Sequence, residues 1–177
     1  MMRLLRTIYY LRPEQFFGRL WFKLYHPTPD MSPAPNLRPP SGRWIYPAKR
    51  SPSLLGPWTF CFLNVEKELT SVEDWNSSDH DKLWQYNLHY FDDLNAENAR
   101  TRSKWHREFL LRWVAENSPG QGVGWEPYPT SLRIVNWIKW ALAGNALPQE
   151  CVWSLSIQTR WLKKRLEVHL LGNHLFC

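Results

Sequence analysis

Three stretches of the sequence combine aromatic rings with amide, imidazole or guanidinium groups; they read LWQYNLHYFDDL, GWEPYPTSLRIVNWIKW and LEVHLLGNHLF. Aromatic rings stack on the apolar faces of sugar rings, amides supply directed hydrogen bonds, and arginine binds a carboxylate or sulfate through two of them. This mixture favours a cleft for an acidic sugar. Its candidate residues, in chain order, are Asn87, His89, Trp125, Glu126, Tyr128, Arg133, Asn173 and His174.

The same residues also have a purely structural interpretation. Asn173 follows Gly172, and an asparagine there fits the left-handed end of a helix. His89 fits a core histidine whose hydrogen bonds are satisfied inside the protein, and Glu126 could bond nearby backbone. Tryptophans at helical spacing usually lie in a core, so we expect core positions for Trp105, Trp113, Trp137 and Trp161. The residues alone leave both interpretations open.

Other chemistries lack their sequence signals. The cysteines Cys61, Cys151 and Cys177 are odd in number and far apart, which argues against a zinc site or a disulfide framework. A single disulfide stays open, but three free thiols are the favoured expectation. The sequence contains no glycine-rich phosphate loop, HExxH motif or GxSxG motif. We therefore expect neither a metal nor a cofactor.

The chain is basic, with 22 Lys and Arg against 16 Asp and Glu and a net charge of +6. Such a balance favours anionic partners, although a solvated basic surface without a partner explains it equally well. The basic residues are scattered and no nucleic-acid-binding motif is present, so we expect no nucleic acid. No apolar run reaches the ~18 residues of a membrane-spanning helix.

The pattern along the chain divides it into three segments. Residues 1–26 form a basic amphipathic helical segment, for which packing on the domain is favoured over a membrane surface. Residues 27–79 form an extended arm with nine of the 14 prolines, which exclude a helix or a central strand, and it ends in a short strand or hairpin. Residues 80–177 show helical spacing, which predicts paired helices joined by loops.

Two helices near the end of the chain have clear start and stop signals. Thr130 or Ser131 is the predicted cap of a helix that stops at Gly144. Pro148 begins the next helix, which the apolar spacing extends up to Gly172. The fold class predicted from these patterns is mainly α.

In this order and spacing, the three stretches resemble the amino-terminal part of bacterial heparinase II/III-like polysaccharide lyases, and the opening YLRPEQFFGRLWFKL fits that group. The resemblance covers nearly the whole chain. It implies an incomplete α/α toroid of paired helices, preceded by the proline-rich arm, with the family's C-terminal β-sandwich absent. It also implies cleavage of a uronate-containing acidic polysaccharide, such as heparan sulfate, by β-elimination.

The resemblance assigns roles to individual residues. The C5 proton of a uronate is poorly acidic while its carboxylate is charged, so a lyase must neutralise that carboxylate and stabilise the enolate-like charge. By resemblance Asn173 is the neutralising residue and His174 its neighbour in the site. Family members carry the catalytic tyrosine and a second histidine downstream, so we expect the isolated chain to be inactive. The predicted substrate-binding residues are Trp125, Glu126, Tyr128, Arg133, Asn87 and His89.

Two further expectations concern the end of the chain and its location. The apolar ending Leu175, Phe176 and Cys177 indicates truncation, which would expose an apolar face open to association. Polymer-degrading members of the family work in the periplasm, yet the first 26 residues lack the apolar core of a cleavable signal, so periplasm and cytoplasm both stay open. The alternative function is a non-catalytic module that binds an acidic glycan.

Overall fold

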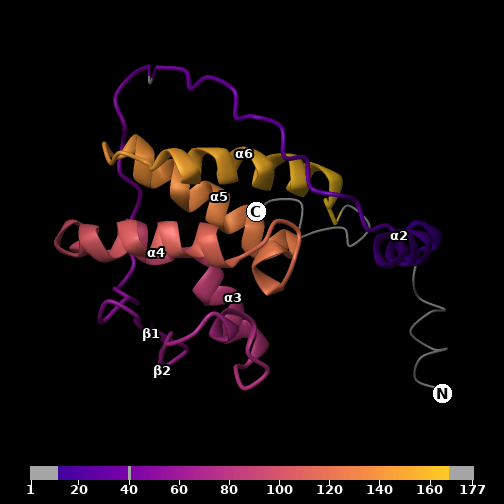
Figure 1. Ribbon diagram of the computed structural model, residues 1–177, viewed down its shortest axis with the longest axis horizontal. Coiled ribbons are helices and arrows are strands. Elements are labelled where there is room, and N and C mark those ends of the chain that lie inside the picture. Colours follow the sequence, from indigo (N-terminus) through magenta and orange to yellow (C-terminus); the bar gives the residue numbers. More distant parts are fainter. Residues whose placement is uncertain (1–11, 40, 168–177) are drawn as a thin grey trace.

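The computed structural model describes residues 12–39 and 41–167, and this part of the chain is mainly helical with one two-stranded sheet (Figure 1). The mainly α prediction is confirmed at this level. Closure of the helix pairs into a toroid stays a prediction. Its helices and strands are α2 Pro13–Leu24, β1 Thr59–Phe62, β2 Val65–Glu68, α3 Lys82–Tyr90, α4 Ser103–Glu116, α5 Pro127–Leu142 and α6 Gln149–Lys164. The short 3-10 turns are η1 Glu73–Asn76, η2 Asp92–Asn95, η3 Ala99–Arg102 and η4 Val123–Trp125.

Helix α5 is the central element of the helical body, because it contacts α3, α6, η2 and η4. It begins earlier than the caps predicted from Thr130 or Ser131, since Pro127 occupies its first turn. A proline is tolerated there because the first N–H groups of a helix have no partner within it. The predicted stop is confirmed: α5 ends at Leu142, and Gly144 follows with a positive φ of 93°.

The predicted hairpin is confirmed as the antiparallel pair β1 and β2, in which Phe60 pairs with Lys67. Leu63 and Asn64 connect the strands with positive φ values of 54° and 61°, the backbone of the tight turn that suits a twisted hairpin. Phe60 is buried and belongs to the same core as α3 and α4. The hairpin therefore closes one side of the helical body.

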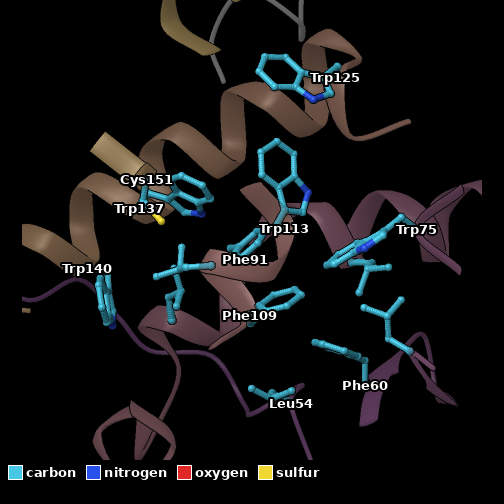
Figure 2. Close-up of a cluster of buried hydrophobic side chains, with 14 of the residues drawn as sticks. Leu54, Phe60, Trp75, Phe91, Phe109, Trp113, Trp125, Trp137, Trp140 and Cys151 are labelled. Carbon is cyan, nitrogen blue, oxygen red and sulfur yellow. The ribbon is translucent and has the colours of Figure 1, made fainter. Parts of the chain in front are cut away.

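Aromatic side chains fill the core, and Figure 2 shows them converging around Trp113. The ring of Phe91 stacks on Phe109 at 4.1 Å between centroids, and Trp113 meets Trp137 edge-on at 5.8 Å. Such pairs add to the apolar area they bury. The core prediction is confirmed for Trp113, Trp137 and Trp161, and Trp105 packs partly buried against the same cluster.

The proline-rich arm passes over α6 in Figure 1, and its described residues 25–39 and 41–53 contain no helix or strand, as predicted. Arg160 of α6 holds it. The Arg160 Nη1 donates to the carbonyls of Asp30 (3.2 Å) and Ser32 (2.8 Å), and Nη2 donates to that of Pro33 (2.8 Å). Backbone carbonyls without partners in a sheet are thus satisfied by one guanidinium.

Helix α2 differs from its expectation. It buries no residue, and Phe17, Trp21 and Leu24 are largely exposed. Its attachment to the body includes Arg165, whose Nη1 donates to the carbonyls of Phe22 (2.9 Å) and Tyr25 (2.6 Å). The favoured expectation of packing on the domain is therefore met only by polar anchoring. No helix in residues 12–39 and 41–167 is long and apolar enough to span a bilayer.

Two end-of-chain predictions have different outcomes. Helix α6 ends at Lys164, well short of the predicted Gly172. The predicted catalytic residues Asn173 and His174 lie outside the described residues.

Of the cysteines, Cys61 and Cys151 are free thiols, and burial, aided by the Glu150 carboxylate, raises the pKa of Cys151 to about 12.

Candidate functional site

Residues 124–129, which read GWEPYP, connect η4 to α5 and include the first three residues of α5; we call them the GWEPYP loop. They lie directly on a buried histidine. A Cβ atom added to Gly124 would come within 2.6 Å of the His89 Nδ1 atom, closer than real side-chain contacts. Glycine is therefore required at this point of the loop, because only it allows the backbone to approach the imidazole so closely. The loop is consequently fixed against α3 before α5 begins.

His89 is a structural histidine in this arrangement. Its Nδ1 accepts a hydrogen bond from the Trp113 indole (3.0 Å), so its Nε2, 3.0 Å from the Trp75 carbonyl oxygen, carries the proton and donates. Burial first, and then the charge of Arg133, lower its pKa to about 3. The imidazole is thus neutral at physiological pH and has both nitrogens engaged.

Arg133 of α5 ties the loop to its surroundings. Its Nη1 donates to the Gly124 carbonyl (2.7 Å), its Nε donates to the Gln158 side chain of α6 (2.9 Å), and its guanidinium lies 3.8 Å from the centre of a Trp113 ring. Burial lowers its pKa. Among the residues that the structure describes it has no ion pair, so carbonyl and amide oxygens with an aromatic face satisfy this cation.

These positions correct part of the predicted substrate-binding set. Arg133 and His89 are 0% exposed and Trp125 is 2% exposed, with its indole donating to the Asn117 carbonyl (3.3 Å). Arg133 and His89, buried and bonded in this way, have no surface to offer a substrate. They support the loop from beneath, a role that residue type alone does not distinguish from direct contact. Trp125 belongs to the loop itself and lines the hollow described below.

Glu126, by contrast, lies at the surface and joins two elements. It is the residue that precedes α5, a position where a carboxylate usually caps its own helix, yet it makes no such cap. It accepts hydrogen bonds from the Tyr86 hydroxyl and the Lys82 ammonium, both on α3. We call Lys82, Tyr86 and Glu126 the Glu126 cluster. The rings of Tyr90 and Tyr128 lie beside it, edge-to-face at 5.8 Å.

The tyrosine of this cluster is not poised as a base. Partial burial is the main cause that raises the pKa of Tyr86, and the hydrogen bond to Glu126 adds to it. Tyr86 therefore stays protonated at physiological pH and can donate a hydrogen bond but cannot accept a proton. Its place one helical turn after Lys82 puts both side chains on one face of α3.

Asn87 is not brought to this cluster. Its side-chain amide donates to the Leu83 carbonyl of its own helix (2.8 Å), and within the described residues no hydrogen bond connects it to the GWEPYP loop. Of the predicted substrate-binding residues, Glu126 and Tyr128 both contact Tyr86 of α3, through a hydrogen bond and through rings 6.4 Å apart, whereas Asn87 does not.

A hollow of about 300 Å³ lies beside the GWEPYP loop, between it and the end of α6. We call it the loop hollow. The loop contributes Trp125, Glu126 and Pro127 to its lining. The other residues that line it are Phe22, His26, Gly120, Gly122, Trp161, Arg165 and Glu167. Glu167 is in the third stretch, which continues to Asn173 and His174 outside the described residues.

Sequence reasoning did not select Lys82 or Arg165. Lys82 had a usable signal, since it is four residues before Tyr86 and shares its helix face. Arg165 had none, because its place in the loop hollow depends on where α6 ends.

A second polar cluster is buried and structural. Asp93 accepts hydrogen bonds from the backbone of Ser53 (2.7 Å) and Leu54 (3.0 Å), and from the side chains of Arg102 (2.8 Å) and His106 (2.7 Å). Burial alone would raise the pKa of Asp93, but these four donors outweigh it and lower the pKa to about 2. The cluster connects the arm, at Ser53 and Leu54, to η2 and η3. In the described part of the chain, no group of His, Cys, Asp and Glu could hold a metal ion.

No known family, curated protein or solved structure matches this chain. The functional argument therefore rests on the residues and their geometry. The loop hollow is lined by the aromatic rings of Trp125 and Trp161 and by the guanidinium of Arg165. The carboxylate of Glu126 binds the Lys82 ammonium and the Tyr86 hydroxyl beside it. The hollow has room for a ligand of the size of a sugar unit, and its charged lining consists of Arg165, Glu126 and Glu167.

Proposed function

We propose that this chain forms part of the substrate cleft of a lyase that cleaves a uronate-containing acidic polysaccharide by β-elimination, as the resemblance to heparinase II/III-like lyases implies. One observation carries the proposal. The GWEPYP loop and Glu167, which come from two of the three stretches that carry the resemblance, line the same loop hollow. Segments about 40 residues apart thus border one hollow, which supports the proposal of a shared site.

The hollow offers a sugar carboxylate or sulfate one arginine, Arg165, although the carboxylates of Glu126 and Glu167 also line it. Among the described residues only the Nη1 of Arg165 is hydrogen-bonded, which leaves donors for a ligand anion. Lys82 lies beside the hollow and neutralises Glu126, its ion-pair partner. Tyr128 supplies an aromatic face beside them.

The proposed reaction breaks the bond between C4 and the glycosidic oxygen after a base removes the C5 proton, and leaves a 4,5-unsaturated uronate. Asn173 donates its amide hydrogens to the uronate carboxylate in this proposal, which lowers the cost of charge developing at C5. Since Tyr86 stays protonated, we do not assign it as the base. The proton-transfer residues of the resembled family are the downstream tyrosine and histidine.

The second candidate function is a non-catalytic module that binds an acidic glycan. The observation that favours it is the same protonated Tyr86, the tyrosine that contacts Glu126, because a binding site requires no base. The two proposals differ at Asn173. An amide that neutralises the uronate carboxylate is required by the lyase and has no special role in the module.

The test combines an activity assay with equilibrium binding on the purified 177-residue chain. We expect no rise in ultraviolet absorbance from unsaturated products on heparan sulfate. Calorimetry at moderate salt should show binding to heparan sulfate, weaker binding to sulfated dextran, which lacks uronate, and none to neutral dextran. Arg165→Gln should weaken heparan sulfate binding about tenfold, the loss of one charged hydrogen bond. Lys104→Gln, an exposed lysine on α4, is the charge-matched control.

The results separate the proposals. Asn173→Ala should weaken binding of a uronate oligosaccharide about tenfold if the lyase proposal holds, and leave binding unchanged if the module proposal holds. Equal binding of heparan sulfate and sulfated dextran, with no effect of Arg165→Gln, would reject both. Turnover by the isolated chain would reject the expectation that it is inactive.

A further inference from the structure

A second, larger hollow of about 420 Å³ lies between the proline-rich arm and the helical body. We call it the arm pocket. It includes Ala143, just past the last residue of α5, whereas the loop hollow includes Pro127, the first residue of α5. A helix of 16 residues is roughly 24 Å long, so the two hollows are separated by about that length.

The charge of the arm pocket is positive. Lys49 from the arm and Arg100 from η3 are in its lining, which includes no aspartate or glutamate. Within the described residues neither cation forms an ion pair, whereas the neighbouring Arg50 pairs with Asp92 at 2.7 Å. The Lys49 ammonium lies 6.0 Å from the centre of the Tyr46 ring, so it stands beside the aromatic face of the hollow. Two cations without carboxylate partners at one hollow concentrate an anion there.

The polar and aromatic lining matches a sugar rather than a bare ion. Tyr46 is 54% exposed, and its hydroxyl reaches the Ala143 carbonyl at 3.5 Å, so the ring stands at the junction of arm and body. Asn98 and Asn145 add side-chain amides to the lining. The Trp44 indole N–H is buried and has no hydrogen-bond partner among the described residues, a donor left to be satisfied.

We propose that the arm pocket is a second site for an anionic sugar unit, a uronate or a sulfated sugar, of a polysaccharide. Tyr46 supplies the stacking face, Lys49 and Arg100 bind the carboxylate or sulfate, and the amides bind hydroxyls. The site rests on the proposed function only in taking the unit to belong to the same acidic polysaccharide. It is otherwise separate from the loop hollow and requires no catalysis.

The separation of the two hollows gives the second site a measurable consequence. A chain long enough to reach both is held twice, so its affinity exceeds that of a short oligosaccharide through effective concentration. Loss of the arm pocket should remove that gain and leave short-chain binding at the loop hollow intact.

The test measures binding of heparan sulfate and of a short uronate oligosaccharide by calorimetry. The variants are Tyr46→Ala, Tyr46→Phe and the double variant Lys49→Gln/Arg100→Gln, with Lys104→Gln/Lys163→Gln, two exposed lysines on α4 and α6, as the charge-matched control. We expect Tyr46→Ala and the double variant each to lower heparan sulfate affinity about tenfold. Tyr46→Phe should retain it, because the ring remains. Sulfated dextran and desulfated heparan sulfate, measured in parallel, distinguish sulfate from carboxylate as the bound group.

Unchanged affinity in Tyr46→Ala, or equal losses in the double variant and its control, would overturn the second site. Inorganic sulfate is added at the same concentration of charge as the heparan sulfate. If it removes all heparan sulfate binding, the second site is also overturned, because a site for a simple ion explains that result. If Arg165→Gln and Asn173→Ala weaken binding while the arm-pocket variants do not, only this inference fails. If the reverse holds, the proposed function fails and the second site stands.

Discussion

At the residue scale, two buried polar side chains form the support of the GWEPYP loop. Arg133 binds the Gly124 carbonyl from beneath, and His89 lies so close to Gly124 that no other residue fits there. Removing one partner of such a network leaves buried donors or acceptors unsatisfied, which costs more than the hydrogen bond itself contributes. The loop geometry therefore depends on Gly124, Arg133 and His89 together.

Replacement of Gly124 by alanine tests this dependence. The new Cβ would lie 2.6 Å from the His89 Nδ1 atom, so the imidazole or the loop must move and the Trp113 hydrogen bond is strained. We expect a loss of roughly 1–3 kcal/mol in the free energy of unfolding, measured with urea. The same substitution in a His89→Ala background is the control, because without the imidazole the added Cβ atom has no close neighbour in that ring and the additional loss should be smaller. Equal losses in the two backgrounds would contradict the role given to His89.

The stability of the protein should depend on pH through His89. Its pKa is about 3 in the folded protein against an ordinary 6.5, so below pH 6.5 the unfolded chain binds a proton that the folded chain excludes. The free energy of unfolding should therefore fall as pH falls, approaching about 1.4 kcal/mol per pH unit. Asp93, with a pKa lowered to about 2 from 3.8, adds a loss in the same direction only below about pH 4.

Urea midpoints between pH 6.5 and pH 4.5, a range above the pH at which Asp93 contributes, measure this slope. His89→Gln should be less stable at every pH but should lose most of the slope. His80 also has a lowered pKa, through burial and then Lys67, and is partly exposed, so His80→Gln should remove a smaller part. A slope that persists in His89→Gln would refute a neutral, buried imidazole.

At the element scale, sequence and structure agree on types and differ at boundaries. The hairpin, the arm and the stop at Gly144 follow from alternation, proline content and helix-end chemistry. The start of α5 was misplaced because two prolines, read as part of a loop, fit the first turn of a helix. Arg133 was predicted to bind substrate, but it is buried and binds protein oxygens instead. Helical periodicity predicts which face of α5 is buried, but it does not predict that an arginine on that face has hydrogen-bond partners inside the protein.

The attachment of the arm to α6 gives a testable prediction. Arg160→Ala removes the donors to three arm carbonyls, so protease cleavage within residues 27–39 should accelerate several-fold. The global free energy of unfolding should change by less than about 1 kcal/mol, because the arm buries little of the core. Lys163→Ala, an exposed lysine on the same helix, is the matched control. Equal cleavage rates in the two variants would show that Arg160 does not hold the arm.

At the scale of the whole molecule, the net charge of +6 favours an anionic partner, and the two hollows are where we propose that it binds. The sequence predicted that Glu126 and Tyr128 belong to a substrate site, which stays a prediction; in the structure both contact Tyr86 of α3. The sequence did not predict the arm pocket, because Lys49 and Arg100 are far apart in the sequence and no local pattern joins them. Long-range contacts of this kind arise from how the arm lies on the body.

The most direct test of the central claim is hydrogen–deuterium exchange of the chain with and without a saturating heparan sulfate oligosaccharide. The account predicts slower exchange in peptides covering residues 120–128 and 161–167, the two sides of the loop hollow. The hairpin, Thr59–Phe62 with Val65–Glu68, serves as the internal reference and should not change. Protection absent from both sides of the loop hollow, or confined to the hairpin, would contradict the assignment of this hollow as the acidic-polysaccharide site.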